Sequence, residues 1–225
     1  MAKALARTEV DQTRDKIIES AGKVFADRGY HATTVRDVCK LAGANVAAVN
    51  YHFGDKLGLY REVLQHSARA AKEGIAAALE SKGPPEEILK AVVRARIQSL
   101  FGDGRRDWQF RIMLHEVTQP TPVIAHVVEE IMRPTYTRLL AVIGEILGLP
   151  AEHETTRLCQ NSIMGQILLY PLAWPLLAHF WPQLKKTPAQ LDRVAEHIAE
   201  FSLAYLVQQG SKNRRLVSRS RGRRS

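Results

Sequence analysis

The sequence predicts an all-α protein with a small N-terminal three-helix unit followed by a larger helical domain. Three observations lead to this prediction. Apolar residues recur at three- and four-residue spacing along nearly the whole chain. Residues that start and end helices separate these stretches. The 225 residues are 45% hydrophobic and 24% charged, a composition typical of a globular protein with a sizeable core.

The first two helices are expected within residues 11–42. An apolar stripe at i, i+4, i+7 and i+8 predicts a helix over residues 11–27: Ile17, Ala21, Val24 and Phe25. Gly29 ends it. Thr34 and Asp37 then have the spacing of a capping box, which predicts a second helix. One face of that helix is apolar: Val35, Val38, Cys39 and Ala42.

A tight turn and a third short helix follow. Ala42, Gly43 and Ala44 predict the turn, and Asn45 is a favourable N-cap residue. The core-facing stripe of the third helix is expected to be Val46, Val49 and Phe53. Three short helices within about 50 residues indicate a helix-turn-helix unit.

The opposite face of the third helix is small and polar. The expected DNA-facing side chains are Ala47, Ala48, Asn50, Tyr51 and His52, with Lys56 in the next helix. Small alanines allow close approach to a surface, an asparagine amide matches an adenine edge, and hydroxyl, imidazole and ammonium groups donate to phosphate. On spacing alone, a solvated helix face with incidental polar residues is an equal alternative.

Four further helices and one long last helix are expected. They cover residues 55–80, ended by Gly83, then 86–100, 106–117 and 122–147, the last interrupted by Pro134. A proline kink leaves room for a pocket between packed helices. Thr187 and Pro188 predict the start of the last helix, which is expected to end before Gly210.

Aromatic, methionine and a few polar residues are candidates to line that pocket. They are Trp108, Phe110, Met113, His115, Glu116, Met132, Tyr136, Met164, Gln166, Leu168, Tyr170, Trp174 and Phe180. At helical spacing, most residues of these types fill a core instead. His115, Glu116 and His126 are not expected to bind metal because no second cluster of ligand residues accompanies them. No cofactor is expected.

Two apolar faces near the C-terminus are candidate dimer contacts. They comprise Leu158, Ser162, Gly165 and Leu169 on one helix, and Leu191, Val194, Ile198, Phe201 and Tyr205 on the last helix. Two copies of each helix make a four-helix interface. The alternative is that both faces are buried within one subunit.

Composition limits the environment and the partners. Seven of the excess positive charges lie in residues 210–225, which hold no acidic residue and are expected to be a disordered basic tail able to contact a polyanion. The two cysteines allow no disulfide framework, and the N-terminus lacks a signal-peptide pattern. Residues 158–184 carry no charge, but Pro171, Pro175 and Pro182 argue against a membrane span. A cytoplasmic protein with no membrane contact is expected.

Residues 13–60 resemble the N-terminal DNA-binding domain of the TetR family of transcriptional repressors. The matching positions are Phe25, Gly29, Tyr30, Thr33, Thr34, Ala42, Gly43, Tyr51, His52, Phe53 and Lys56. Where many members have Ser-x-Gly-x-Leu-Tyr, this chain has Asn45, Ala47, Val49 and Asn50. Residues 111–122, 129–136 and 157–170 resemble the regulatory domain of the CecR-like subgroup.

The resemblance implies a homodimeric repressor that binds double-stranded operator DNA and responds to a small-molecule effector. It adds Thr33, Thr34, Asn45 and Val46 to the candidate DNA-binding residues. The expected domains are residues 1–54 for DNA binding, 55–209 for regulation and dimerisation, and 210–225 for the basic tail. An enzyme is disfavoured because no nucleophile elbow or phosphate loop appears. A helical adaptor that binds only protein is the alternative.

Overall fold

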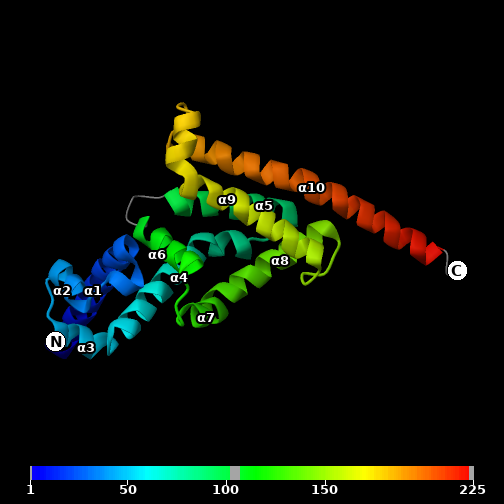
Figure 1. Ribbon diagram of the computed structural model, residues 1–225. Helices are drawn as coiled ribbons and strands as arrows, with labels where there is room; N and C mark the ends of the chain where they lie inside the picture. Colours follow the sequence, from blue (N-terminus) through cyan, green and yellow to red (C-terminus); the bar gives the residue numbers. More distant parts are fainter. Residues whose placement is uncertain (1, 102–106, 223–225) are drawn as a thin grey trace. The chain divides into compact units, whose positions relative to one another are not determined.

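The computed structural model describes residues 2–101 and 107–222, and every regular element in these ranges is helical (Figure 1). The helices are α1 (Ala2–Ala32), α2 (Val35–Ala42), α3 (Val46–Phe53), α4 (Lys56–Glu80), α5 (Pro85–Phe101), α6 (Asp107–Thr118), α7 (Ile124–Val127), the π-helical η1 (Val128–Met132), α8 (Arg133–Leu147), α9 (Glu154–Phe180) and α10 (Pro188–Gly222). The expected all-α fold class is confirmed.

The chain forms two compact units. The N-terminal unit contains Met1–Ala70 and Gly104–Met132, and the C-terminal unit contains Ala71–Asp103 and Arg133–Ser225. These units divide the chain differently from the expected boundary after residue 54. Residues 107–132 join the helix-turn-helix segment because several of their apolar side chains share its core.

The end of α1 and the start of α2 lie where the sequence predicts them. Gly29 has a non-helical, positive φ of 75° within α1, which breaks the helix before Ala32. Thr34 caps α2, accepting from the backbone N–H of Asp37 while the Asp37 carboxylate accepts from the Thr34 backbone N–H. The expected capping box is confirmed.

The helix α6 packs against α1 in this unit (Figure 1), and Trp108 of α6 is part of that contact. Trp108 is 3% exposed, and a Cβ added at Gly22 would come within 2.3 Å of its ring. The indole Nε1–H also donates to Oε1 of Glu19 at 3.2 Å. Trp108 is therefore a core residue of the N-terminal unit, and its place in an effector pocket stays a prediction.

Two polar side chains at the end of α6 complete the same packing. The Tyr60 hydroxyl of α4 donates to Oε1 of Glu116 at 2.7 Å, and the backbone N–H of Thr121 donates to its Oε2 at 3.0 Å. His115 Nε2 lies 3.1 Å from the Ala26 carbonyl oxygen of α1. Burial raises the pKa of Tyr60, so its hydroxyl stays a donor at neutral pH. His115 and Glu116 thus hold the N-terminal unit together, and their role as ligand anchors stays a prediction.

The predicted interruption of residues 122–147 lies one turn before Pro134. There η1 replaces the α-helical pattern over Val128–Met132. Proline has no backbone N–H to give to the carbonyl four residues earlier, and a π-helical turn accommodates that missing bond.

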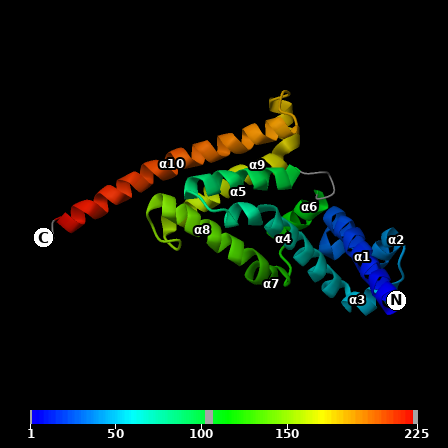
Figure 2. The ribbon, with the colours of Figure 1, turned by 180° about the vertical axis from the view of Figure 1, so that it is seen from behind.

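The C-terminal unit is a bundle of α5, α8, α9 and α10 in which α10 runs beside α5 (Figure 2). Its core takes apolar residues from all four helices. Leu191, Val194 and Ile198 of α10 are 6%, 4% and 1% exposed. For these three residues the predicted dimer contact is wrong, because they are buried against their own chain.

The helix α9 is continuous through Pro171 and Pro175, contrary to the expected interruption. Both prolines lie in its last three turns. By length and composition α9 is apolar enough to cross a membrane, and only 11% of its most apolar window is buried. Such a helix is weak evidence for a membrane segment.

The last helix continues beyond Gly210 to Gly222, so the expected disordered tail is helical as far as the structure describes it. Docking on the C-terminus of α8 explains the extension. Asn213 Nδ2 donates to the Leu147 carbonyl at 2.9 Å, and an Arg214 N–H donates to the Ile146 carbonyl at 3.4 Å. These are carbonyls at a helix end, which cations and amide donors stabilise.

Candidate nucleic-acid interface

Caps at both ends of the turn fix the orientation of α3 relative to α2. Gly43 ends α2 in the left-handed conformation, with φ 61° and ψ 34°. Two residues later, Asn45 Oδ1 accepts from the Ala48 backbone N–H at 2.7 Å and starts α3. The predicted turn and N-cap are confirmed, and the result is a helix-turn-helix.

The outer face of α3 is open. Tyr51 is 80% exposed, and Ala47 and Asn50 are also exposed, whereas Val49 and Phe53 are buried. Val46 is 42% exposed, so its expected place in the core is wrong. It lies at the first position of α3, beyond the reach of the core, and its exposure keeps it among the candidate DNA-facing residues.

Two candidate residues before α2 have structural roles. Thr33 is 1% exposed, and its hydroxyl donates to the Gly29 carbonyl at 2.8 Å. The expectation that Thr33 contacts DNA is wrong because its side chain satisfies the broken end of α1. Thr34 is exposed, but its hydroxyl is engaged with the Asp37 carboxylate at 2.6 Å.

His52, near the end of α3, and Lys56, the first residue of α4, are half-buried. The Lys56 ammonium lies 4.5 Å from the centre of the Tyr30 ring and donates to the His31 carbonyl at 3.4 Å. An ammonium has three donors, so two remain for a phosphate. The His52 ring contacts the Tyr51 ring edge to face, with centroids 5.1 Å apart.

Sequence reasoning missed the cations of α1 and α2. Arg36 and Lys40 are exposed on α2, and the Lys16 ammonium lies 3.7 Å from where a Cβ would project at Gly43. Arg36 and Lys40 are four residues apart, opposite the buried stripe of α2, so a helical projection of residues 35–42 identifies them. Lys16 comes from another helix, and only the packing places it beside the turn.

The capping box makes α2 sensitive to acid. Hydrogen bonds from Thr34, and then the Arg28 charge 3.2 Å away, hold the pKa of Asp37 below its usual value. A carboxylate with a lowered pKa stabilises the fold above its unfolded pKa of about 3.9, and that contribution disappears as pH falls through the folded pKa. We expect Asp37→Asn to be less stable than wild type at pH 7 and the difference to shrink below about pH 4.

Urea midpoints measured by circular dichroism over a pH series check this prediction. Asp11→Asn, at an exposed position of α1, is the control. A difference between Asp37→Asn and wild type that stays constant down to acid pH would contradict the capping role of the carboxylate.

The remaining pocket candidates are divided between the two units. Met113 packs against the core of the N-terminal unit, and Met132 is 40% exposed. In the C-terminal unit the half-buried candidates are Tyr136, Met164, Gln166, Leu168, Tyr170 and Trp174. Trp174 contacts Phe101 edge to face at 5.0 Å, and Gln166 Nε2 donates to the Ser202 hydroxyl at 3.4 Å. Gln166 therefore links α9 to α10.

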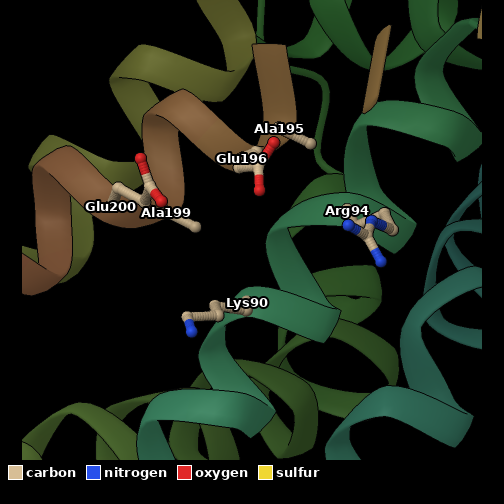
Figure 3. Close-up of a pocket in the computed structure, with 6 residues that line it drawn as sticks. All are labelled: Lys90, Arg94, Ala195, Glu196, Ala199 and Glu200. Carbon is tan, nitrogen blue, oxygen red and sulfur yellow. The ribbon is translucent and has the colours of Figure 1, made fainter. Parts of the chain in front are cut away.

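A shallow hollow of about 70 Å³ lies between α5 and α10. Figure 3 shows Lys90 and Arg94 on α5 and Glu196 and Glu200 on α10, and two alanines of α10 complete the lining. Its volume is well below the roughly 300 Å³ at the lower end of small-molecule pockets. Charged side chains of both signs line this hollow, and it is too small for an effector.

The predicted dimer face is exposed on α9 and partly on α10. Leu158 and Leu169 are 58% and 50% exposed, with Ser162 and Gly165 exposed between them. On α10, Phe201 and Tyr205 are 65% and 50% exposed, unlike the three buried candidates before them.

A capped helix-turn-helix with an open outer face, in a chain whose other unit is a helical bundle, defines a DNA-binding transcriptional regulator. The family model "Bacterial regulatory proteins, tetR family" matches residues 17–63, and the model "HTH-type transcriptional dual regulator CecR, C-terminal domain" matches residues 85–206. The chain belongs to the TetR family and has a C-terminal domain of the CecR type. The adaptor alternative gives no account of these matches.

Curated relatives agree with this assignment. The chain is 25% identical to the HTH-type transcriptional dual regulator CecR of Shigella flexneri over 173 residues, which are 72% of this chain and 77% of that protein. It is 34% identical to the HTH-type transcriptional activator FasR of Mycolicibacterium smegmatis over 85 residues. That match covers 38% of this chain and 39% of FasR.

Solved structures share the fold. FadR from Bacillus subtilis, determined in complex with stearoyl-CoA, has a TM-score of 0.64 at 19% identity and covers 84% of this chain and 96% of FadR. PfmR from Thermus thermophilus has a TM-score of 0.62 at 21% identity, with coverages of 84% and 97%.

Proposed function

We propose that the protein is a cytoplasmic repressor that binds a palindromic operator as a homodimer and releases it when a small apolar or aromatic effector binds its C-terminal unit. The exposed outer face of α3 carries the proposal. It presents Asn50 and Tyr51 to solvent from a helix whose two ends are capped. A recognition helix of this kind enters the major groove.

The exposed side of α9 supports the dimer. Leu158, Ser162, Gly165, Leu169, Leu172 and Leu176 alternate at four- and three-residue spacing, and all are exposed. Leucines at both ends and small residues in the middle suit a close helix crossing with a second copy. A two-fold axis makes the preferred operator palindromic, with half-sites about 34–36 Å apart.

The effector class rests on the aromatic residues that border the C-terminal core. Phe101, Tyr170 and Trp174 are half-buried and pack against it. Burial raises the pKa of Tyr170, which keeps its hydroxyl neutral. Such side chains suit an apolar or aromatic molecule carrying few polar groups.

The test of DNA reading is Asn50→Ala with Tyr51→Phe as its contrast. We expect Asn50→Ala to cost about 1–3 kcal/mol at the preferred operator and to relax the choice of base there. Tyr51→Phe removes only a phosphate donor, so it should weaken binding to all sequences by a similar factor. Operator selection from random DNA, followed by gel shift, measures both effects.

Unchanged affinity and unchanged base preference in Asn50→Ala would show that α3 reads DNA through other residues. Circular dichroism of each variant serves as the control for folding, since both side chains lie on the exposed face.

A further inference from the structure

Arg14 of α1 contacts both α3 and the helix that follows it. Its guanidinium carbon lies 5.8 Å from the centre of the Phe53 ring, at the end of α3. One of its terminal nitrogens also donates to the Glu62 carboxylate of α4. A single side chain of α1 therefore connects three helices of the N-terminal unit. Neither Arg14 nor Glu62 is among the residues expected to contact DNA.

The shape of the guanidinium explains how Arg14 makes both contacts at once. The group is planar, so its flat side packs on an aromatic ring while the N–H donors at its edge bind a carboxylate. The side chains of Arg14 and Glu62 are 37% and 31% exposed, and a partly buried ion pair is screened less than one on the open surface. Phe53 is 9% exposed and belongs to the core of the unit. Arg14 therefore links α4 to a packed residue of α3.

This contact is made at the part of α3 that carries the candidate reading side chains. Asn50 and Tyr51 lie within one turn of Phe53, on the exposed face. The chain leaves α3 at Gly54, which has a positive φ of 79° and donates its N–H to the Asn50 carbonyl at 2.9 Å. These local bonds shape the end of the helix. Arg14 comes from a separate helix, so it resists a tilt of α3 that local bonds allow.

We infer that Arg14 is a positioning residue for DNA reading, which holds α3 in one orientation through Phe53 and Glu62. The inference rests on the proposed function, in which α3 enters the major groove. If a reading helix takes several orientations, operator affinity falls in proportion to the fraction of molecules in the competent one. Binding to non-operator DNA depends on phosphate contacts and does not need that single orientation. Loss of the Arg14 contacts should therefore lower operator preference more than general DNA affinity.

Glu62→Gln tests the inference because charge and positioning predict different results. Removal of a carboxylate makes the protein more positive, which by charge alone strengthens binding to all DNA. If Glu62 holds Arg14 in place, the ratio of operator to non-operator affinity should fall by about three- to tenfold. Asp15→Asn is the matched control, since Asp15 lies 4.0 Å from the same guanidinium but is 78% exposed on α1 itself. Its affinity ratio should equal that of wild type.

Arg14→Lys gives a second test in which the net charge does not change. A lysine keeps the positive charge but lacks the flat guanidinium that contacts Phe53 and Glu62 together. We expect its operator preference to fall while its affinity for non-operator DNA stays at the wild-type level. Fluorescence anisotropy of the full-length proteins, with the preferred operator and a scrambled duplex, measures both affinities. The temperature is chosen so that circular dichroism shows every variant to be folded.

Hydrogen exchange without DNA gives a readout that does not depend on operator binding. We expect Glu62→Gln to speed the exchange of amides in residues 46–54 about threefold or more, because α3 opens locally when its orientation is no longer fixed. Amides of α5, in the C-terminal unit, serve as the internal control and should exchange as in wild type. A uniform increase over the whole N-terminal unit would make the Arg14–Glu62 pair a general stabilising contact and overturn the inference.

Comparison with Asn50→Ala separates this inference from the proposed function. If Asn50→Ala lowers operator preference and neither Glu62→Gln nor Arg14→Lys does so, the inference is wrong and the proposed role of α3 stands. If none of the three variants changes the preference, the proposed reading helix is wrong. The exchange of residues 46–54 then still decides whether Arg14 fixes the orientation of α3.

Discussion

Replacing Gly165 by phenylalanine is expected to convert the protein from a dimer to a monomer and to lower its operator affinity by about 10²–10⁴-fold. Gly165 lies in the middle of the exposed stripe of α9, and no atom of its own chain lies within 4 Å of where a Cβ would project. A large side chain there fits the isolated subunit but separates two closely crossing helices. A monomer holds one half-site at a time and loses the advantage of two linked contacts.

Gly83 offers a matched control because a Cβ there also meets nothing within 4 Å, and it lies in the loop between α4 and α5. Gly83→Phe should stay dimeric with wild-type affinity. Sedimentation and gel shift on both variants decide the matter. A Gly165→Phe protein that remains dimeric and binds operator normally would place the dimer contact elsewhere.

Replacing Gly58 by alanine is expected to lower the free energy of unfolding by roughly 1–3 kcal/mol or more and to weaken operator binding. A Cβ at Gly58 would lie 2.0 Å from the Phe53 carbonyl oxygen. Backbone occupies that space, so α4 has to move away from the end of α3. The Asp55 carboxylate, which accepts from the Gly58 N–H at 2.7 Å, holds the two helices in this close contact.

Urea unfolding followed by circular dichroism, with Gly83→Ala as the control, measures the loss. If Gly58→Ala is as stable as wild type, the close contact between Gly58 and the Phe53 carbonyl does not contribute to the stability of the fold. On the proposal that α3 reads DNA, a shift of its C-terminal end should also reduce operator affinity in native conditions.

Local signals in the sequence are sufficient for the helix-turn-helix. Thr34 with Asp37, Gly43 and Asn45 act through hydrogen bonds or dihedral angles within a few residues, so their spacing alone predicts the caps that the structure contains. The outer face of α3 follows from the period of the helix, which is why Asn50 and Tyr51 are correctly predicted on the exposed side. The prediction that Val46 is buried is wrong. The spacing of apolar residues identifies which face of α3 is turned to the core, but it does not show how many turns of that face the core covers.

Only the tertiary structure shows which residues far apart in the sequence contact each other. An apolar or titratable side chain on a helix looks the same in the sequence whether it fills a core, lines a pocket or meets a second subunit. Trp108 packs on Gly22, and the Glu116 carboxylate accepts a hydrogen bond from the Tyr60 hydroxyl. Helix packing in the C-terminal unit likewise buries Ile198 of α10, which is 1% exposed, and leaves Phe201 of the same helix 65% exposed. The sequence by itself determined the fold class, the caps and the exposed outer face of α3, since these depend on local geometry. Which long-range partners satisfy each buried group depends on how helices from distant segments pack, and only the folded chain specifies that.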